Sequence, residues 1–131
     1  MKRTTLLHAE LSEVIARLGH GDMLVIGDAG LPIPDGPRRI DLAVSANLPP
    51  FIDVLKAVLS EMQVESAVLA EEIVARNPAV NAATLQLLGS TPVARMSHED
   101  FKALSARARA IVRTGEFSPY ANVILRAGVV F

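Results

Sequence analysis

The 131-residue sequence contains no cysteine, no tryptophan and a single tyrosine. The absence of cysteine excludes a disulfide framework, a thiolate metal site and a cysteine nucleophile. Aromatic side chains make up 4% of the residues and apolar ones 50%. We therefore expect a core built from Val, Leu, Ile and Ala.

The sequence also lacks an excess of charge of either sign. Its 13 Lys and Arg residues stand against 14 Asp and Glu residues, which gives a formal net charge of −1. Such a chain has no net field to hold nucleic acid or anionic lipid, so we expect neither partner. No apolar run approaches the roughly 20 residues of a membrane span, and no signal-like segment opens the chain. These absences predict a soluble cytoplasmic protein.

The length suits a single domain over residues 1–131, and eight Gly and eight Pro residues punctuate it at short intervals. Short apolar runs alternate with amphipathic segments, which predicts an α/β fold: a three-layer sandwich with a mostly parallel mixed sheet of about six strands and helices on both faces. The last two strands would pair as an antiparallel edge. The expected strands are 23–26, 39–44, 64–69, 91–96, 110–113 and 122–125. Helices are expected before Gly19 (as a left-handed stop), after Pro49-Pro50, from Asn77-Pro78 to Leu88-Gly89, and from Ser97.

Several motifs of common enzymes are missing. The segment Gly27-Asp28-Ala29-Gly30 lacks the spacing of a dinucleotide fingerprint, and there is neither a Walker loop nor a G-x-S-x-G elbow. No two of the three histidines have the short helical spacing of a zinc motif. We therefore expect no metal site, no dinucleotide, and neither phosphoryl transfer nor serine hydrolysis.

Polar residues that follow strands are the first candidates for a site, because open α/β sheets bind ligands at the carboxyl ends of their strands. Asp28 directly follows the first predicted strand, and His98 lies in the first turn of a helix after another. Each has a second interpretation. Asp28 also suits a turn aspartate that caps its own loop, and His98 an exposed first-turn residue.

His20 stands between two glycines, where its imidazole has little company from neighbouring side chains. With an unperturbed pKa of about 6.5, imidazole suits general acid/base work, although a histidine here also suits the dipole of the preceding helix. Tyr120 and Asn122 offer a phenol and a carboxamide, which together can bind several hydroxyl groups. A turn packed by an aromatic ring is the alternative there.

Six segments in order along the chain resemble the D-ribose pyranase (ribose mutarotase) family. The resemblance is carried by residues 18–22, 28–34, 61–65, 97–102, 113–122 and 127–131. One triplet departs from it: His20-Gly21-Asp22 is similar to the related fucose mutarotase family, whereas ribose members often have threonine after the histidine.

The resemblance implies a cofactor-independent isomerase that interconverts the pyranose and furanose forms of D-ribose, and possibly its anomers. It implies that His20 is the catalytic acid/base and that Asp28, His98, Tyr120, Ala121 and Asn122 hold the sugar. Lys102 matches a position near the pocket. Members of the family form ring-shaped homo-oligomers, so a pentamer or decamer with sites near subunit contacts is expected.

We expect the His20 imidazole and the Asp28 carboxylate to converge on one water-accessible hollow, with Asp28 orienting His20 or a sugar hydroxyl. Three alternatives are open. A fucose-type mutarotase would exchange α and β anomers, a sugar-binding module would bind without turnover, and a scaffold would use the same polar residues for structural hydrogen bonds alone.

Overall fold

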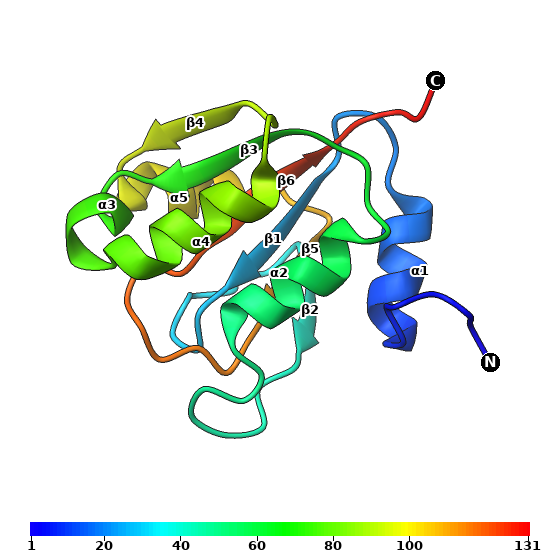
Figure 1. Ribbon diagram of the computed structural model, residues 1–131, viewed down its shortest axis with the longest axis horizontal. Helices are drawn as coiled ribbons and strands as arrows, with labels where there is room; N and C mark the ends of the chain where they lie inside the picture. The colour runs from blue at the N-terminus through cyan, green and yellow to red at the C-terminus, as the bar shows by residue number, and fades with distance from the viewer.

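The computed structural model describes all 131 residues and contains one six-stranded sheet in the order β2-β5-β1-β6-β3-β4. The strands are β1 (Met23–Gly27), β2 (Arg38–Asp41), β3 (Val64–Ala70), β4 (Val93–Met96), β5 (Ala110–Arg113) and β6 (Val123–Ala127). Five of them run parallel, whereas β6 is antiparallel to both of its neighbours, β1 and β3 (Figure 1). The predicted α/β class and mixed, mostly parallel sheet are confirmed.

Helices cover both faces of the sheet. They are α1 (Ala9–Arg17), α2 (Phe51–Leu59), α3 (Ile73–Arg76), α4 (Pro78–Leu88) and α5 (His98–Ser105). A core of 21 buried residues joins one face to α1, α2, α3 and α4, while a smaller core of eight, which includes Phe101 of α5, lies on the other face. The predicted three-layer arrangement is therefore correct.

The apolar run at residues 23–26 forms the strand that the sequence predicts. All five residues of β1 are buried, and the strand pairs with β5 on one side and β6 on the other. A strand with two neighbours and two covered faces has no polar side to present, which is why its sequence does not alternate. This strand fixes the positions of the two segments that flank it.

The prediction for the end of the chain is wrong in one respect. Strands β5 and β6 do not pair with each other, because β1 lies between them, and the sheet edges are β2 and β4. Residues 114–122 contain no helix to carry the chain back across the sheet. The strand that follows β5 must therefore start on the side of the sheet where β5 ends and run antiparallel to it. This strand, β6, lies between β1 and β3 in the interior of the sheet.

Three local predictions also need correction. Helix α1 ends at Arg17, and the positive φ that we expected at Gly19 occurs at Gly21, with φ 85°. Strand β2 ends at Asp41, where the predicted strand continued to Val44. The sequence pattern also missed the single turn of α3.

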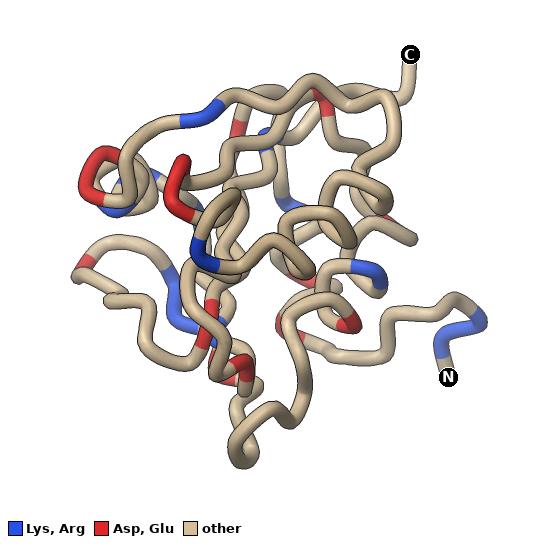
Figure 2. The backbone as a smooth tube through the Cα atoms, turned by 60° about the vertical axis from the view of Figure 1, so that its left-hand side comes forward, with Lys and Arg blue, Asp and Glu red and all other residues tan.

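The strand directions divide the loops between two edges of the sheet. The segments that follow β1, β4 and β5, together with the segment before β6, lie where the parallel strands end. We call this side of the sheet the carboxyl edge, which is distinct from the edge strands β2 and β4. The segments before β1 and β3 and after β6 lie at the opposite edge. Acidic and basic residues are interspersed around the backbone (Figure 2). None of the helices has the length and apolar character that a membrane span requires.

Candidate functional site

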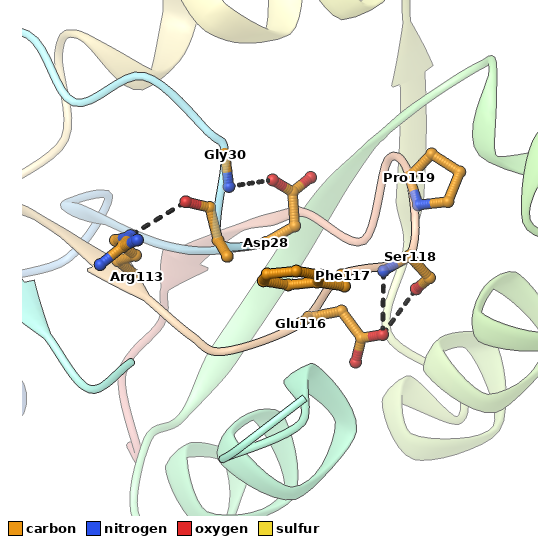
Figure 3. A pocket seen from close by; sticks show the side chains of 8 residues that line it. Asp28, Gly30, Arg113, Glu116, Phe117, Ser118 and Pro119 are labelled. Atoms are coloured by element: carbon orange, nitrogen blue, oxygen red, sulfur yellow. Dashed lines mark hydrogen bonds between the residues drawn. The ribbon is translucent and has the colours of Figure 1, made fainter. Parts of the chain in front are cut away.

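A hollow of about 370 Å³ opens at the carboxyl edge. The segment after β1 forms one side of it, and the end of β5 with the loop that precedes β6 forms the other (Figure 3). The residues that line it are Asp28, Ala29, Gly30, Arg113, Glu116, Phe117, Ser118 and Pro119. Of the predicted site residues, Asp28 is the one that lines this hollow.

Hydrogen bonds hold the Asp28 segment on three sides. The N–H of Gly30 donates to Asp28 Oδ1 at 2.8 Å, and the N–H of Asp28 donates to Asn122 Oδ1 at 2.8 Å. Arg113 Nε donates to the carbonyl of Ala29 at 2.9 Å. The carboxylate is thereby fixed at the hollow, and its second oxygen is left to accept from a ligand.

Asn122 is fully buried and divides its carboxamide between two tasks. Its Oδ1 serves Asp28, whereas its Nδ2 has no hydrogen-bond partner in the protein. A Cβ at Gly27 would lie 2.9 Å from that Oδ1 and 2.5 Å from Leu31 Cδ2, so glycine alone permits this close packing. The free donor is a buried polar group that calls for a partner from outside the chain.

Tyr120 and His98 pack against each other next to Asn122. The backbone at Tyr120 has φ 57°, and the N–H of Asn122 donates to the carbonyl of Tyr120 at 2.9 Å. This tight turn brings the Tyr120 ring edge-on to His98, with 5.1 Å between ring centroids. The N–H of His98 donates to the Glu72 carboxylate at 3.0 Å, while its buried Nδ1 has no partner.

The structure thus brings together five of the predicted residues, Asp28, His98, Tyr120, Ala121 and Asn122, at one sheet edge. Ala121 is fully buried and contributes backbone between Tyr120 and Asn122. Lys102, on α5, places its Nζ 2.7 Å from Glu99, one helical turn away. Its contact in this chain is therefore a surface ion pair.

Glu116 is a site residue that the sequence reasoning did not single out. Its carboxylate accepts the N–H of Phe51 at 3.0 Å, at the start of α2, and the hydroxyl of Ser118 at 2.7 Å. Asn77 Nδ2 donates to the same hydroxyl oxygen at 2.9 Å. These bonds tie the loop wall of the hollow to two helices.

Arg113 was also missed, although it is the last residue of the predicted strand 110–113. Its Nη1 lies 3.1 Å from Asp41 Oδ2. The pKa of Asp41 is held below its usual 3.8, first by the N–H of Ala43 and then by Arg113, against an opposing effect of burial. Asp41 is therefore charged near neutral pH, and its ion pair holds Arg113 at the rim of the hollow.

His20 lies at the opposite edge of the sheet from the rest of the predicted set. His20 precedes β1, and Asp28 follows β1. A five-residue strand spans about 16 Å at roughly 3.3 Å per residue, which separates the two residues along the strand. The His20 side chain is 61% exposed and bonds to Glu65, with 2.7 Å between Nε2 and Oε2. The expectation that His20 and Asp28 converge on one hollow is therefore wrong for two residues of one chain. Within one chain, Asp28 does not orient His20.

The carboxyl edge offers an alternation of hydrogen-bonding groups. Asp28 supplies a carboxylate acceptor, Asn122 a carboxamide donor, His98 a ring nitrogen and Tyr120 a phenol. Each hydroxyl of a polyol both donates and accepts, so a set of mixed donors and acceptors is suited to binding one. Neither Asp28 nor His98 belongs to a group of three or more His, Asp or Glu side chains that could hold a metal ion.

Comparisons with known proteins agree with this description. The model of the RbsD / FucU transport protein family matches residues 1–130. The chain is 61% identical over 131 residues to a D-ribose pyranase of Symbiobacterium thermophilum, with both sequences covered in full.

Two solved structures have the same fold and cover the whole of both chains. The structure of Bacillus subtilis RbsD complexed with D-ribose is 45% identical, with a TM-score of 0.97. A fucose mutarotase in complex with L-fucose from Streptococcus pneumoniae is 27% identical, with a TM-score of 0.86.

Proposed function

Because the chain belongs to the RbsD / FucU transport protein family, we propose that it is an isomerase that interconverts the pyranose and furanose forms of D-ribose. Relatives named D-ribose pyranase cover its full length at 53–64% identity. The ribose-bound relative is closer in sequence and in fold than the fucose-bound one. Both comparisons favour ribose over fucose as the sugar.

The observation that carries the proposal is the pair of unpartnered buried atoms, Asn122 Nδ2 and His98 Nδ1, at the same sheet edge as the Asp28 carboxylate. Leaving a buried polar atom without a partner costs about 1–3 kcal/mol. A sugar hydroxyl bound at each atom would remove that cost. The site therefore has more to gain from a polyol than from an apolar ligand.

His20 is the proposed acid/base group. Opening the ring breaks the bond between the anomeric carbon and the ring oxygen, which needs one proton on that oxygen and the loss of one from the anomeric hydroxyl. His20 accepts the second proton and supplies the first, so that the aldehyde forms without net proton change. Closure on a different hydroxyl reverses the same steps and gives the furanose. One such group contributes about 10²–10⁴ in rate.

Since His20 and Asp28 lie at opposite edges of the sheet, the proposal requires His20 from a second copy of the chain. A contact between the two different edges is head-to-tail, and repetition of it closes a ring when the rotation between copies allows. The exposed apolar residues Val129, Val130 and Phe131 leave the sheet after β6, at the same edge as His20. They offer apolar surface for that contact.

The activity is tested by saturation-transfer NMR on D-ribose with and without the protein. The expected result is magnetisation transfer between pyranose and furanose signals that rises with protein concentration. The same measurement on L-fucose follows α–β exchange. Faster transfer for fucose would instead identify a fucose-type mutarotase, and binding of either sugar without transfer would identify a sugar-binding module.

The hypothesis of a fucose-type mutarotase has one observation in its favour, the triplet His20-Gly21-Asp22. In the structure, Gly21 adopts φ 85° and a Cβ there would meet nothing within 4 Å. Within one chain, the glycine therefore serves the turn. This triplet carries less weight than the identity along the full chain.

A further inference from the structure

The carboxylate of Glu65, on β3, is the hydrogen-bond partner of the His20 imidazole, with 2.7 Å between Oε2 and Nε2. The backbone of the His20 turn is held by other bonds. The N–H of Gly21 donates to the carbonyl of Ala127 at 2.8 Å, and that of Gly19 to Asp22 Oδ2 at 2.9 Å. Glu65 is thus not needed to form the turn, and its bond acts on the direction of the His20 side chain.

The backbone of β3 is irregular at Glu65. Val64 pairs with Ala127, and Ser66 pairs with Arg126, so two steps along β3 oppose one step along β6. Glu65 is the additional residue of this β-bulge. A bulge costs ladder hydrogen bonds and changes the direction of a side chain, and bulges are common beside active sites. Here the redirected side chain is the one that meets His20.

Glycine at position 128 lets the bulge pack closely. A Cβ on Gly128 would lie 3.1 Å from Glu65 Cβ and 3.3 Å from Glu65 N. The N–H of Gly128 also donates to the carbonyl of Gln63 at 2.9 Å, which fixes the end of β6 against the start of β3. Any larger residue at position 128 would press on Cβ and the backbone nitrogen of Glu65.

We propose that Glu65 is the positioning residue for His20, an inference that rests on the acid/base role proposed for that histidine. A carboxylate accepts a hydrogen bond and has none to donate, so Nε2 carries the proton in the Glu65 bond. Nδ1 is then the nitrogen that takes the proton from the anomeric hydroxyl and returns it to the ring oxygen. The carboxylate also stabilises the imidazolium that exists between these two transfers.

The test compares Glu65→Ala, Glu65→Gln and wild-type protein by ring-exchange NMR, with Glu13→Ala as the control. Glu13 is also a surface carboxylate in ion pairs, with Arg17 and Arg38, and belongs to no part of the site. We expect Glu65→Ala to lower kcat at least about tenfold while KM changes less than about twofold. Glu65→Gln, whose amide oxygen still accepts from Nε2 but carries no charge to stabilise the imidazolium, should recover part of the rate, and Glu13→Ala should leave it unchanged.

A second measurement is independent of turnover. The ¹⁵N shifts of the His20 ring report which nitrogen carries the proton, and we expect Nε2 in wild type and in Glu65→Gln but a mixture in Glu65→Ala. An unchanged kcat in Glu65→Ala, or Gln as slow as Ala, would overturn the inference. The role of His20 itself is tested separately: if His20→Ala exchanges ribose at the wild-type rate, the proposed mechanism fails whatever Glu65 does.

Discussion

The backbone N–H of Asp28 donates to the side-chain oxygen of Asn122 across 2.8 Å, between residues 94 positions apart in the chain. This bond joins the end of β1 to the start of β6 and sets the direction of the whole carboxamide. The Nδ2 atom of Asn122 is therefore held in a fixed direction, buried and without a partner. One side chain supports the site structurally through its oxygen and leaves its nitrogen free for the ligand that we propose.

Replacing Asn122 by Asp separates these two tasks. The carboxylate still accepts from the Asp28 N–H but has no hydrogen to donate to a sugar, and it adds a negative charge near Asp28. We expect ribose affinity to fall about tenfold or more, which corresponds to roughly 1.4 kcal/mol. Asn122→Ala should lose affinity and also about 1–3 kcal/mol of stability, because the Asp28 N–H is then unpartnered. Calorimetric titration and urea unfolding measure the two effects, and an unchanged affinity in both variants would remove Asn122 from the binding site.

Gly27→Ala tests the close packing behind Asn122. The added Cβ would meet Leu31 Cδ2 at 2.5 Å and Asn122 Oδ1 at 2.9 Å, so both side chains must shift. We expect a loss of about 1–3 kcal/mol in the free energy of unfolding and weaker ribose binding. Gly19→Ala is the matched control, since its Cβ would have its nearest contact at 3.6 Å. Equal stability of the two variants would contradict the packing described here.

His98→Phe keeps an aromatic ring against Tyr120 and removes the buried Nδ1 that has no partner in the protein. Removing an unpartnered polar atom costs little, so stability should change by less than about 1.5 kcal/mol. Ribose affinity should fall, because the variant lacks the ring nitrogen that we propose for sugar binding. The increase of Tm on adding ribose reports both quantities. A ribose-induced increase equal to that of wild type would show that His98 does not touch the sugar.

Mixing two inactive variants tests whether a site uses two copies. His20→Ala and Asp28→Ala should each lose most ring exchange while remaining folded, since His20 is exposed and Asp28 lines an open hollow. If the two residues of a site come from different copies, unfolding and refolding the variants together should restore part of the rate. Refolding each variant alone is the control. No recovery in hetero-oligomers that are shown to form would contradict the shared site.

The pH dependence of stability should include a contribution from Asp22. The N–H of Gly19, and then Arg109, hold the pKa of Asp22 below its usual 3.8. A lowered folded-state pKa stabilises the protein above the unfolded-state pKa, and this contribution is lost as the pH falls through the folded-state value. Asp22→Asn should therefore lower the free energy of unfolding at pH 7 and 5, with a smaller effect below about pH 3.8.

Urea unfolding of wild type and Asp22→Asn at several pH values measures this difference. Asp35→Asn, a change at an exposed loop carboxylate, serves as the control. A difference between wild type and Asp22→Asn that grows as the pH falls from 5 to 3 would have the wrong sign for this explanation.

Local patterns in the sequence predicted most of the elements. The apolar run of β1, the Asn77-Pro78 start of α4 and the Ser97 cap of α5 each depend on neighbouring residues, and the Ser97 hydroxyl does accept the N–H of Asp100 at 3.1 Å. The prediction was wrong where distant residues decide. Whether β6 lies at an edge or in the interior depends on pairing with β1 and β3, which no local pattern records.

For the site, the sequence by itself determined which residue types were available and which of them follow strands. That was enough to make Asp28 and His98 candidates, because strand ends are local features, whereas Tyr120 and Asn122 were candidates for their phenol and carboxamide. Tertiary structure alone decided that His20 lies at the other edge, that a bulge turns Glu65 toward it, and that Glu116 anchors a loop to α2. The physical reason is that these relations join segments 45 and 65 residues apart, and strand order and direction, not local preference, determine which distant segments meet.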